Sequence, residues 1–493
     1  MATLITKGIE SKLKKQIVLR DSKIKTYRLK LRNKEKQLQR KIRSLLLIQL
    51  KHKELLSSYN ELSASHQELS KYHPPISSLD LSYCRNYSYP IWVIQLCILV
   101  QVEVGVSHRQ VCLILSIIFK LLGFELAIPA HTTVRDWVHK FGKNELDKDL
   151  LEDKSQVAII DESIGIGQEQ CFLALGIDAQ KWSSAPKSLT HADVSVCALG
   201  TSKGWNSESI KDLLWDKKEQ YRYVVSDNCR TLGKAIRLCG LIHVPDCTHF
   251  IGNWIKNKCQ NNELFKALIG EMAKKRTQWC YTNYSGMLPP RMRAKSKFLN
   301  IYEIAHWLEK VLVHMDKMDT PHKEALDFVS TNQCFAYTIV HLATITRRIF
   351  KLLKTQGINE LTTTEIYEIF ATYQEEKQQT IPILKEMEAA IIEYVQKIRN
   401  SLPMEKNILC CSDIIESVFG RYKYRNEKNS YKGITQDILV CAIFGKKITP
   451  ENVKDAINKV TCMSLTKWVK ENLVPHYTQN KRNFWMALVE NKP

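Results

Sequence analysis

Apolar residues at the start of the chain repeat at every seventh position. Between residues 9 and 73 there is neither glycine nor proline to interrupt a helix. The repeats form two overlapping series: Ile17, Ile24, Leu31, Leu38 and Leu45, then Ile48, Leu55, Leu62 and Leu69. Sustained heptads are typical of coiled coils, so we predict one over residues 1–75 that joins copies of the chain into a homo-oligomer. A solvated helix packed on its own protein is the alternative.

Helical patterns continue over residues 76–150. The apolar run 91–106 predicts a core helix, because it is too short and too polar to cross a bilayer. Ser107 and Gln110 have the spacing of a capping box, and the helix that they begin is expected to end at Gly123. We therefore predict a small helical domain and no membrane partner.

A second helix of this domain, with a basic side, is predicted after Pro129. We expect it to be short and capped by a threonine, with Trp137 and Val138 inward. Its outward basic residues are His131, Arg135 and Lys140. Such a pair of helices is compatible with a helix-turn-helix, so these three residues are candidates for DNA binding. An ordinary helical hairpin has the same pattern.

Short apolar runs over residues 151–256 predict a sheet. The runs lie at 157–160, 171–177, 195–199, 223–225 and 241–244, with helices predicted at 205–217 and 231–239. In the second helix we expect Leu232, Ile236 and Leu238 to point inward and Gly240 to end it. Three meandering strands followed by alternating helices and strands are the plan of a ribonuclease H-like sheet. In that plan the first and fourth strands are neighbours.

Acidic residues stand where the apolar runs of two predicted strands end. Asp161 and Glu162 follow the first run, and Asp227 follows the fourth. Ligands gather at the carboxyl ends of parallel strands, so we expect Asp161 and Asp227 to face the same region. Glu162 is a competing candidate at the first position. Asp161 has a structural alternative as the cap of a turn, and Asp227 as the cap of the following helix.

A third acid is predicted on a helix beyond an α-helical block at residues 257–408. This helix is expected to begin at Ser412 and to carry Glu416 about one turn in. Its buried stripe is predicted to contain Ile415, Val418, Phe419 and Tyr422. Glu416 borders that stripe, whereas Asp413 lies at the helix start, where free amide groups already stabilise a carboxylate. We therefore favour Glu416, and Asp413 is its rival.

One more acid follows the last predicted strand. Asp246 comes directly after Pro245 and is followed three residues later by His249. The two residues could form a local capping pair at a helix start, or they could shape the site beside the strand ends.

Net charge is concentrated at the beginning of the chain. The formal charge is +21 over 493 residues, and residues 1–53 hold 17 Lys and Arg against three acids, a net +14. Arg20, Lys34 and Lys41 stand at core sites of the first heptads, which makes this half a poor zipper. A basic segment of this kind favours a polyanion as partner, most commonly nucleic acid.

The cysteines indicate a reducing compartment. The chain has 15 of them, with no CxxC pair, and several stand in apolar runs, such as Cys97, Cys112, Cys197 and Cys441. From this spacing we expect neither a disulfide framework nor a zinc site. The N-terminus has no apolar segment typical of a signal peptide.

Two aspartates on neighbouring strands and a helix-borne glutamate suit a two-metal phosphoryl-transfer site. Hard carboxylate oxygens hold Mg²⁺ or Mn²⁺ ions about 3.5–4 Å apart in such sites. The ordered set Asp161, Asp227 and Glu416, with Asp246-x-x-His249 and a helical insertion before the third acid, resembles the DDE transposases of the Mutator/hAT-like group. The Ser-x-x-x-Glu-Ser-x-Phe-Gly sequence around Glu416 is similar to the last-acid helix of that family. The resemblance covers roughly residues 105–425.

This resemblance implies an activity and a set of partners. It implies metal-dependent cleavage at the ends of a mobile element and transfer of the 3′-hydroxyl into target DNA. Asp161, Asp227 and Glu416 would hold two Mg²⁺ or Mn²⁺ ions, and Asp246 and His249 would shape the site or a flipped DNA end. The partners would be double-stranded DNA, as terminal inverted repeats and as target. The setting would be the bacterial cytoplasm and nucleoid, for a protein of an insertion sequence.

The predicted domains follow from these patterns. They are a basic coiled coil (1–75), a helical DNA-binding domain with a helix-turn-helix (76–150), the first part of an α/β ribonuclease H-like core (151–256), an all-α insertion (257–408), the last catalytic helix (409–430) and a helical tail (431–493). Two other functions stay open. One is a nuclease or integrase on the same fold, and the other is a domesticated DNA-binding protein whose acids no longer bind metal.

Overall fold

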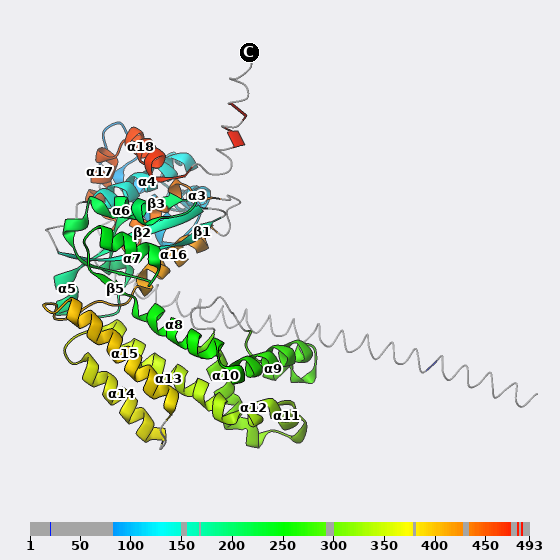
Figure 1. Ribbon diagram of the computed structural model, residues 1–493. Helices are drawn as coiled ribbons and strands as arrows, with labels where there is room; N and C mark the ends of the chain where they lie inside the picture. Colours follow the sequence, from blue (N-terminus) through cyan, green and yellow to red (C-terminus); the bar gives the residue numbers. More distant parts are fainter. Residues whose placement is uncertain are drawn as a thin grey trace, which may run out of the picture. The chain divides into compact units, whose positions relative to one another are not determined.

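The computed structural model separates into two compact units, Met1–Leu79 and Asp80–Pro493. It describes residues 82–148, 155–166, 169–291, 300–377, 381–426 and 433–474, together with Arg20 and residues 481, 482, 485 and 486 (Figure 1). The predicted coiled coil at 1–75 lies, apart from Arg20, outside the described residues and stays a prediction. No helix in the described ranges is long and apolar enough to cross a bilayer.

The centre of the second unit is a mixed sheet of five strands in the order β3-β2-β1-β4-β5. The strands are β1 (Gln156–Ile166), β2 (Glu169–Asp178), β3 (Ser195–Ser202), β4 (Tyr221–Ser226) and β5 (His243–Pro245). β1 and β3 run antiparallel to β2, whereas β1, β4 and β5 are parallel. The predicted pairing of the first and fourth strands is confirmed: Val157 lies opposite Tyr223, and Ile159 opposite Val225.

Both faces of the sheet are covered, which is why its strands are nearly continuous apolar runs. On one face Ala158, Ile160 and Val224 form a core with α6 (Ser207–Trp215) and α7 (Arg230–Leu238). The other face, with Ile159 and Val225, belongs to the larger core of the unit. An α/β core is therefore confirmed.

The inward side of α7 differs from the prediction at one position. Leu232 and Ile236 are buried as expected, but Leu238 is 39% exposed. Six residues separate Leu238 from Leu232, about 600° of helical turn, so the two side chains leave the helix on different sides. Ala235 is buried on the inward side of α7. After the helix, Gly240 has a left-handed backbone conformation with φ +72°.

The helices before the sheet are α2 (Ile91–Glu103), α3 (His108–Leu122) and α4 (His131–Asp147). α2 is a buried core helix, as predicted. The predicted capping box is also present, because Ser107 accepts a hydrogen bond from the backbone of Gln110, whose side chain accepts one from the backbone of Ser107. α3 ends at Gly123, which has φ +70°.

α4 is neither short nor capped by threonine. It has 17 residues, and its N-cap is Ala130, with no side-chain hydrogen bond. Trp137 and Val138 are buried as predicted, but Lys140 is buried too and donates from Nζ to the hydroxyl of Tyr87 at 2.6 Å. Lys140 was predicted to face outward because the helix was expected to pack on one side. Instead α4 contacts α2, α3 and the 3₁₀ helix η6 (Gln436–Ala442).

η6 comes unusually close to α4. A Cβ atom at Gly142 would collide with the carbonyl group of Leu439. The absence of a side chain at this position therefore lets the C-terminal segment pack directly on the α4 backbone.

Between β5 and residue 408 the described chain is helical, as predicted for the insertion. Its α-helices are α8 (Cys247–Gln260), α9 (Glu263–Trp279), α10 (Ile301–His314), α11 (Thr320–Ala325), α12 (Asp327–Thr331), α13 (Gln333–Gln356), α14 (Thr362–Lys377) and α15 (Pro382–Ser401). The backbone of Cys247 donates to the carbonyl of Cys410 at 2.8 Å, and Ile358 pairs with Ile408 in a short bridge. The two ends of the insertion are therefore joined at its base.

The chain then returns to the sheet through α16 (Asp413–Asn426). The predicted stripe of Ile415, Val418, Phe419 and Tyr422 is buried, and α16 contacts β1 and η6. The described part of the tail contains α17 (Pro450–Lys459) and α18 (Cys462–Asn472). α17 has the predicted Thr449 cap, which accepts from the backbone of Asn452.

Candidate active site

Asp161 and Asp227 occupy equivalent places on neighbouring parallel strands. The last parallel pair of β1 and β4 is Ile159 with Val225, and each aspartate comes two residues later. Side chains alternate along a strand, so Asp161 belongs to the face of Ile159, toward the core that contains α16. One detail differs from the prediction: β1 does not end at Asp161 but continues to Ile166, with an irregularity after Asp161.

Local hydrogen bonds fix both carboxylates. Oδ1 of Asp227 accepts from the backbone of Cys229 at 2.9 Å, in the turn before α7, so it supports that turn without being the N-cap. Oδ1 of Asp161 accepts from the backbone of Glu162 at 2.7 Å.

Glu162 adds a third carboxyl close to these two aspartates. Burial is the main cause that raises the pKa of the Glu162 carboxyl; the hydrogen bond from the Cys229 thiol lowers it, and the charges of Asp227 and Asp161 raise it further. That thiol donates to Oε1 at 3.6 Å, and Oε2 is buried with no hydrogen-bond partner within the described ranges. The strand ends therefore concentrate negative charge that protein donors only partly compensate.

Asp246 connects this strand end to α16. Its backbone donates to the carbonyl of Ser226, the last residue of β4, at 2.7 Å. Its Oδ1 atom accepts from the backbone of Ser412, immediately before α16, also at 2.7 Å. Asp246, which is fully buried, thus holds the start of α16 beside the end of β4. Asp227 follows Ser226 directly, and Glu416 comes four residues after Ser412.

The second oxygen of Asp246 caps α8. Oδ2 accepts from the backbone of His249 at 2.7 Å, from its Nδ1 at 2.8 Å, and from the hydroxyl of Thr248. The alternative that Asp246 and His249 form a capping pair at a helix start is therefore confirmed. Asp246 also bonds to the residue before α16, whereas a role of the pair in shaping a catalytic site stays a prediction.

Asp413 and Glu416 have different surroundings on α16. Asp413 forms an ion pair with Lys354, at the end of α13, and its Oδ1 accepts from Thr248 at 3.3 Å. Although burial alone would lower the pKa of Lys354, the hydrogen bond to Asp413 raises it. Glu416 is exposed. The charge of Asp413 thus joins α13 to α16, and the choice of Glu416 as the third acid stays a prediction. Lys354 carried no signal in the sequence, because it resembles any lysine in the last turn of an amphipathic helix.

Two groups among the described residues bring at least three potential metal-ligand atoms within 4.8 Å of one another. They are His108 with His139 and Asp437, and Asp246 with Cys247 and Cys411. Asp161, Asp227 and Glu416 do not form such a group. The carboxylates at the strand ends nevertheless fit hard cations chemically, because such cations prefer carboxylate oxygens and Glu162 retains a buried oxygen without a donor in the described ranges.

No family model matches the chain, and the search of curated proteins gives no match either. The chemistry of the site therefore has to be argued from its residues. All fifteen cysteines are free, and Cys247, Cys410 and Cys411 are buried beside Asp246.

The residues predicted to contact DNA divide into two kinds. His131 and Arg135, in the first turns of α4, are exposed, and Arg135 pairs with the neighbouring Asp136 at 2.9 Å. Lys140 is buried and is not available to a partner. Of the three, only His131 and Arg135 remain candidates for an interface.

Proposed function

We propose that the sheet is a ribonuclease H-like catalytic core and that the protein is a DNA transposase. It would cleave DNA strands at the ends of an element and transfer the resulting 3′-hydroxyl into target DNA. One observation carries the proposal: Asp161 and Asp227 each follow the last parallel pair of adjacent strands, and Asp246 ties the helix of Glu416 to the same strand end.

The reaction needs no energy source beyond the DNA itself. In cleavage, a water oxygen attacks phosphorus and gives up a proton, the P–O3′ bond breaks, and O3′ takes up a proton. In transfer, that 3′-hydroxyl loses its proton and attacks a target phosphorus, and the target P–O3′ bond breaks. One phosphodiester forms as one breaks in the second step.

The roles of the side chains follow from their placement. Asp161, Asp227 and Glu416 would hold two Mg²⁺ or Mn²⁺ ions, which when bound activate the attacking oxygen and stabilise the leaving oxygen. Glu162 stays beside them as a carboxyl that takes up protons more readily than usual. Asp246 and His249 position α8 and α16. The +14 segment, with His131 and Arg135, would supply phosphate contacts in DNA.

The test is cleavage of a supercoiled plasmid by the purified chain in Mg²⁺. We expect Asp227→Asn to reduce nicking on the order of 10³-fold or more, because an amide keeps the shape but loses the anionic charge. DNA binding should be unchanged. Asp212→Asn, on α6, is the matched control and should nick normally.

The outcomes separate the three functions. Near-normal nicking by the Asp227→Asn protein would refute the assignment of this residue. Cleavage without joining to a second DNA would indicate a nuclease. DNA binding with no Mg²⁺-dependent cleavage by the unaltered protein would indicate a DNA-binding protein whose acids are inactive.

A further inference from the structure

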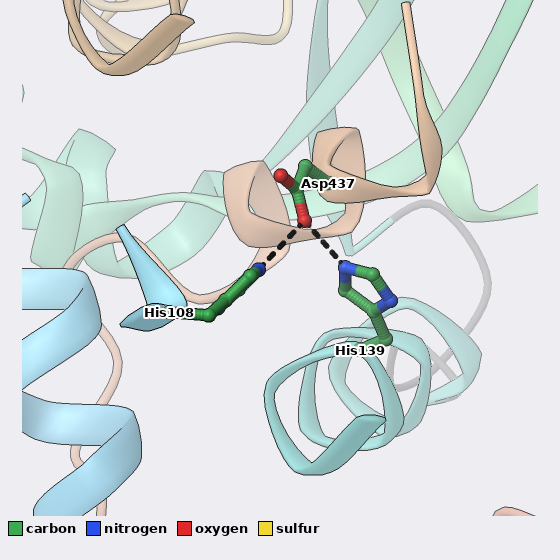
Figure 2. Close-up of side chains that lie close together, drawn as sticks. All are labelled: His108, His139 and Asp437. Carbon is green, nitrogen blue, oxygen red and sulfur yellow. Dashed lines mark hydrogen bonds and ion pairs between the residues drawn. The ribbon is translucent and has the colours of Figure 1, made fainter. Parts of the chain in front are cut away.

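A second cluster of chemical groups lies where α3, α4 and η6 meet. Figure 2 shows the imidazole rings of His108 and His139 both directed at the carboxylate of Asp437. The two Nε2 atoms approach the same Oδ1 atom, at 3.1 Å from His108 and 2.6 Å from His139. The rings are almost perpendicular, at 84°, with centroids 6.0 Å apart. The cluster shares no residue with the acids at the strand ends.

We infer that His108, His139 and Asp437 form a binding site for a divalent transition-metal ion, with Zn²⁺ as the leading candidate. Two imidazole nitrogens and one carboxylate oxygen are a donor set that zinc and its neighbours use, whereas Mg²⁺ prefers oxygen ligands alone. The three ligand atoms lie within 4.8 Å of one another. Around a tetrahedral zinc, ligand atoms stand roughly 3.3 Å apart, so small movements suffice.

The surroundings of His139 and Asp437 favour the forms in which these two residues bind metal. Burial lowers the pKa of His139, despite the opposing effect of Asp437, and so favours the neutral ring. Burial acts to raise the pKa of Asp437, but hydrogen bonds from both histidines hold it well below its ordinary value. Neutral imidazole and ionised carboxylate are the ligand forms.

The surroundings of His108 include a group suited to orient it as a ligand. Nε2 of Gln101 lies 3.2 Å from Nδ1 of His108, while Oε1 of Gln101 is buried without a partner in the described part of the chain. Turning the amide over would let Oε1 accept a hydrogen bond from the protonated Nδ1 of His108, which leaves the lone pair on Nε2 of His108 for the metal. Histidine ligands usually donate from their other nitrogen in this way.

Metal binding requires His139 to move a proton from Nε2 to Nδ1. The Nδ1 atom is buried with no partner in the described ranges, so the proton there would be an unpaired donor, a cost that the bond from Nε2 to the metal has to offset. The side chains of His108 and Asp437 are 14% and 27% exposed, which gives an ion access and leaves room for water as a further ligand.

Such an ion would join distant parts of the sequence. Asp437 is 298 residues from His139 and 329 from His108. Bound metal would therefore fasten the C-terminal segment to α3 and α4. The expectation of no zinc site rested on cysteine spacing, which has no bearing on a site built from histidines.

The experiment is zinc titration of the full chain after removal of metal with a chelator, in competition with a chromogenic chelator. We expect His108→Ala and Asp437→Asn each to weaken one Zn²⁺ equivalent by about 100-fold or more, since even residues that only orient a ligand are worth 10–100-fold. Millimolar Mg²⁺ should not compete. His322→Ala removes an exposed histidine that also bonds to an aspartate, and Cys411→Ser alters the other cluster; both should bind as the unaltered chain does.

Two further measurements keep the test decisive if a variant fails to fold. Co²⁺ bound by the unaltered chain should give ligand-field bands without a sulfur charge-transfer band. Gln101→Glu, which offers only acceptors to His108, should tighten zinc binding by about tenfold. Equal zinc affinity in the unaltered, His108→Ala and Gln101→Glu proteins would overturn the site. The absence of zinc uptake by the unaltered chain would also overturn the site. The three residues would then only hold α3, α4 and η6 together by hydrogen bonds.

Discussion

The sequence Asp-x-x-His occurs at the start of two helices, and the two copies have the same local geometry. Asp246 with His249 begins α8, and Asp319 with His322 begins α11. In both, the aspartate accepts hydrogen bonds from the backbone and from Nδ1 of the histidine. The motif by itself is therefore a helix cap, with no implication of chemistry.

The difference between the copies lies in what the second carboxylate oxygen does. Asp246 is fully buried, and its Oδ1 atom accepts from Ser412, 166 residues away. The side chain of Asp319 is 62% exposed, and its hydrogen bonds to His322 stay within the first turn of its own helix. A cap becomes part of a site only through the contact that it makes elsewhere in the fold.

The largest expected effect concerns the two acids that follow this contact. We expect Glu416→Gln to reduce Mg²⁺-dependent cleavage on the order of 10³-fold or more, since it removes a proposed metal ligand. Asp413→Asn removes an ion pair of a kind worth ~0.2–1 kcal/mol, so we expect the rate of cleavage to fall by at most about fivefold. Plasmid nicking measures both, with circular dichroism to check folding. The reverse order would make Asp413 the third acid, and normal activity in both would leave the site without one.

Removing each capping aspartate tests whether the bond from Ser412 to Asp246 adds to the stability of the fold. Asp246→Ala leaves the Ser412 and His249 amides without their acceptor and the Thr248 hydroxyl with only its longer bond to Asp413, so we expect a loss of about 3–5 kcal/mol in the free energy of unfolding. Asp319→Ala removes an exposed cap and should cost much less. Urea denaturation measures both. Equal losses would mean that the bond to Ser412 adds nothing to the cap.

The smallest expected effect is a change in melting temperature when Glu162 is replaced. Its carboxylate accepts fewer hydrogen bonds than that of Asp246 does. Its pKa in the folded protein is raised, so the folded state takes up a proton more readily than the unfolded state. Stability is therefore lost as the pH rises from the unfolded pKa through the folded one. We expect Glu162→Gln to melt at a higher temperature than the unaltered protein at pH 7, with the difference shrinking toward pH 4. A difference that is independent of pH would show that the Glu162 charge is compensated.

Much of the sheet and its helices could be predicted from local pattern. The apolar runs located the strands, and the stripe of Ile415 and its partners predicted the buried face of α16. Both depend on residues a few positions apart, whose spacing carries the information. The capping box at Ser107 and the glycines after α3 and α7 were predicted correctly for the same reason.

Apart from Leu238, whose error lies in helical spacing, the following errors and omissions have the opposite cause. Lys140 was expected outside because nothing near it in sequence announces η6 or Tyr87. The bond from Asp246 to Ser412 and the pair of Lys354 with Asp413 depend on how the insertion returns to the sheet. Contacts over such separations are set by packing of the whole unit, which a single sequence does not display.

Because the insertion separates the strands from α16, the residues of the proposed site are synthesised at different times. All five strands, with Asp161 and Asp227, have been translated by residue 245, whereas Ser412 follows Asp246 by 166 residues. At about 5–20 residues per second the ribosome needs roughly 8–33 s to make that interval. During that interval the nascent chain contains every strand of the sheet, with Asp161 and Asp227, but not Glu416. A chain that ends before Ser412 therefore has the two aspartates of the proposed site and lacks both its third acid and the partner of Asp246 Oδ1.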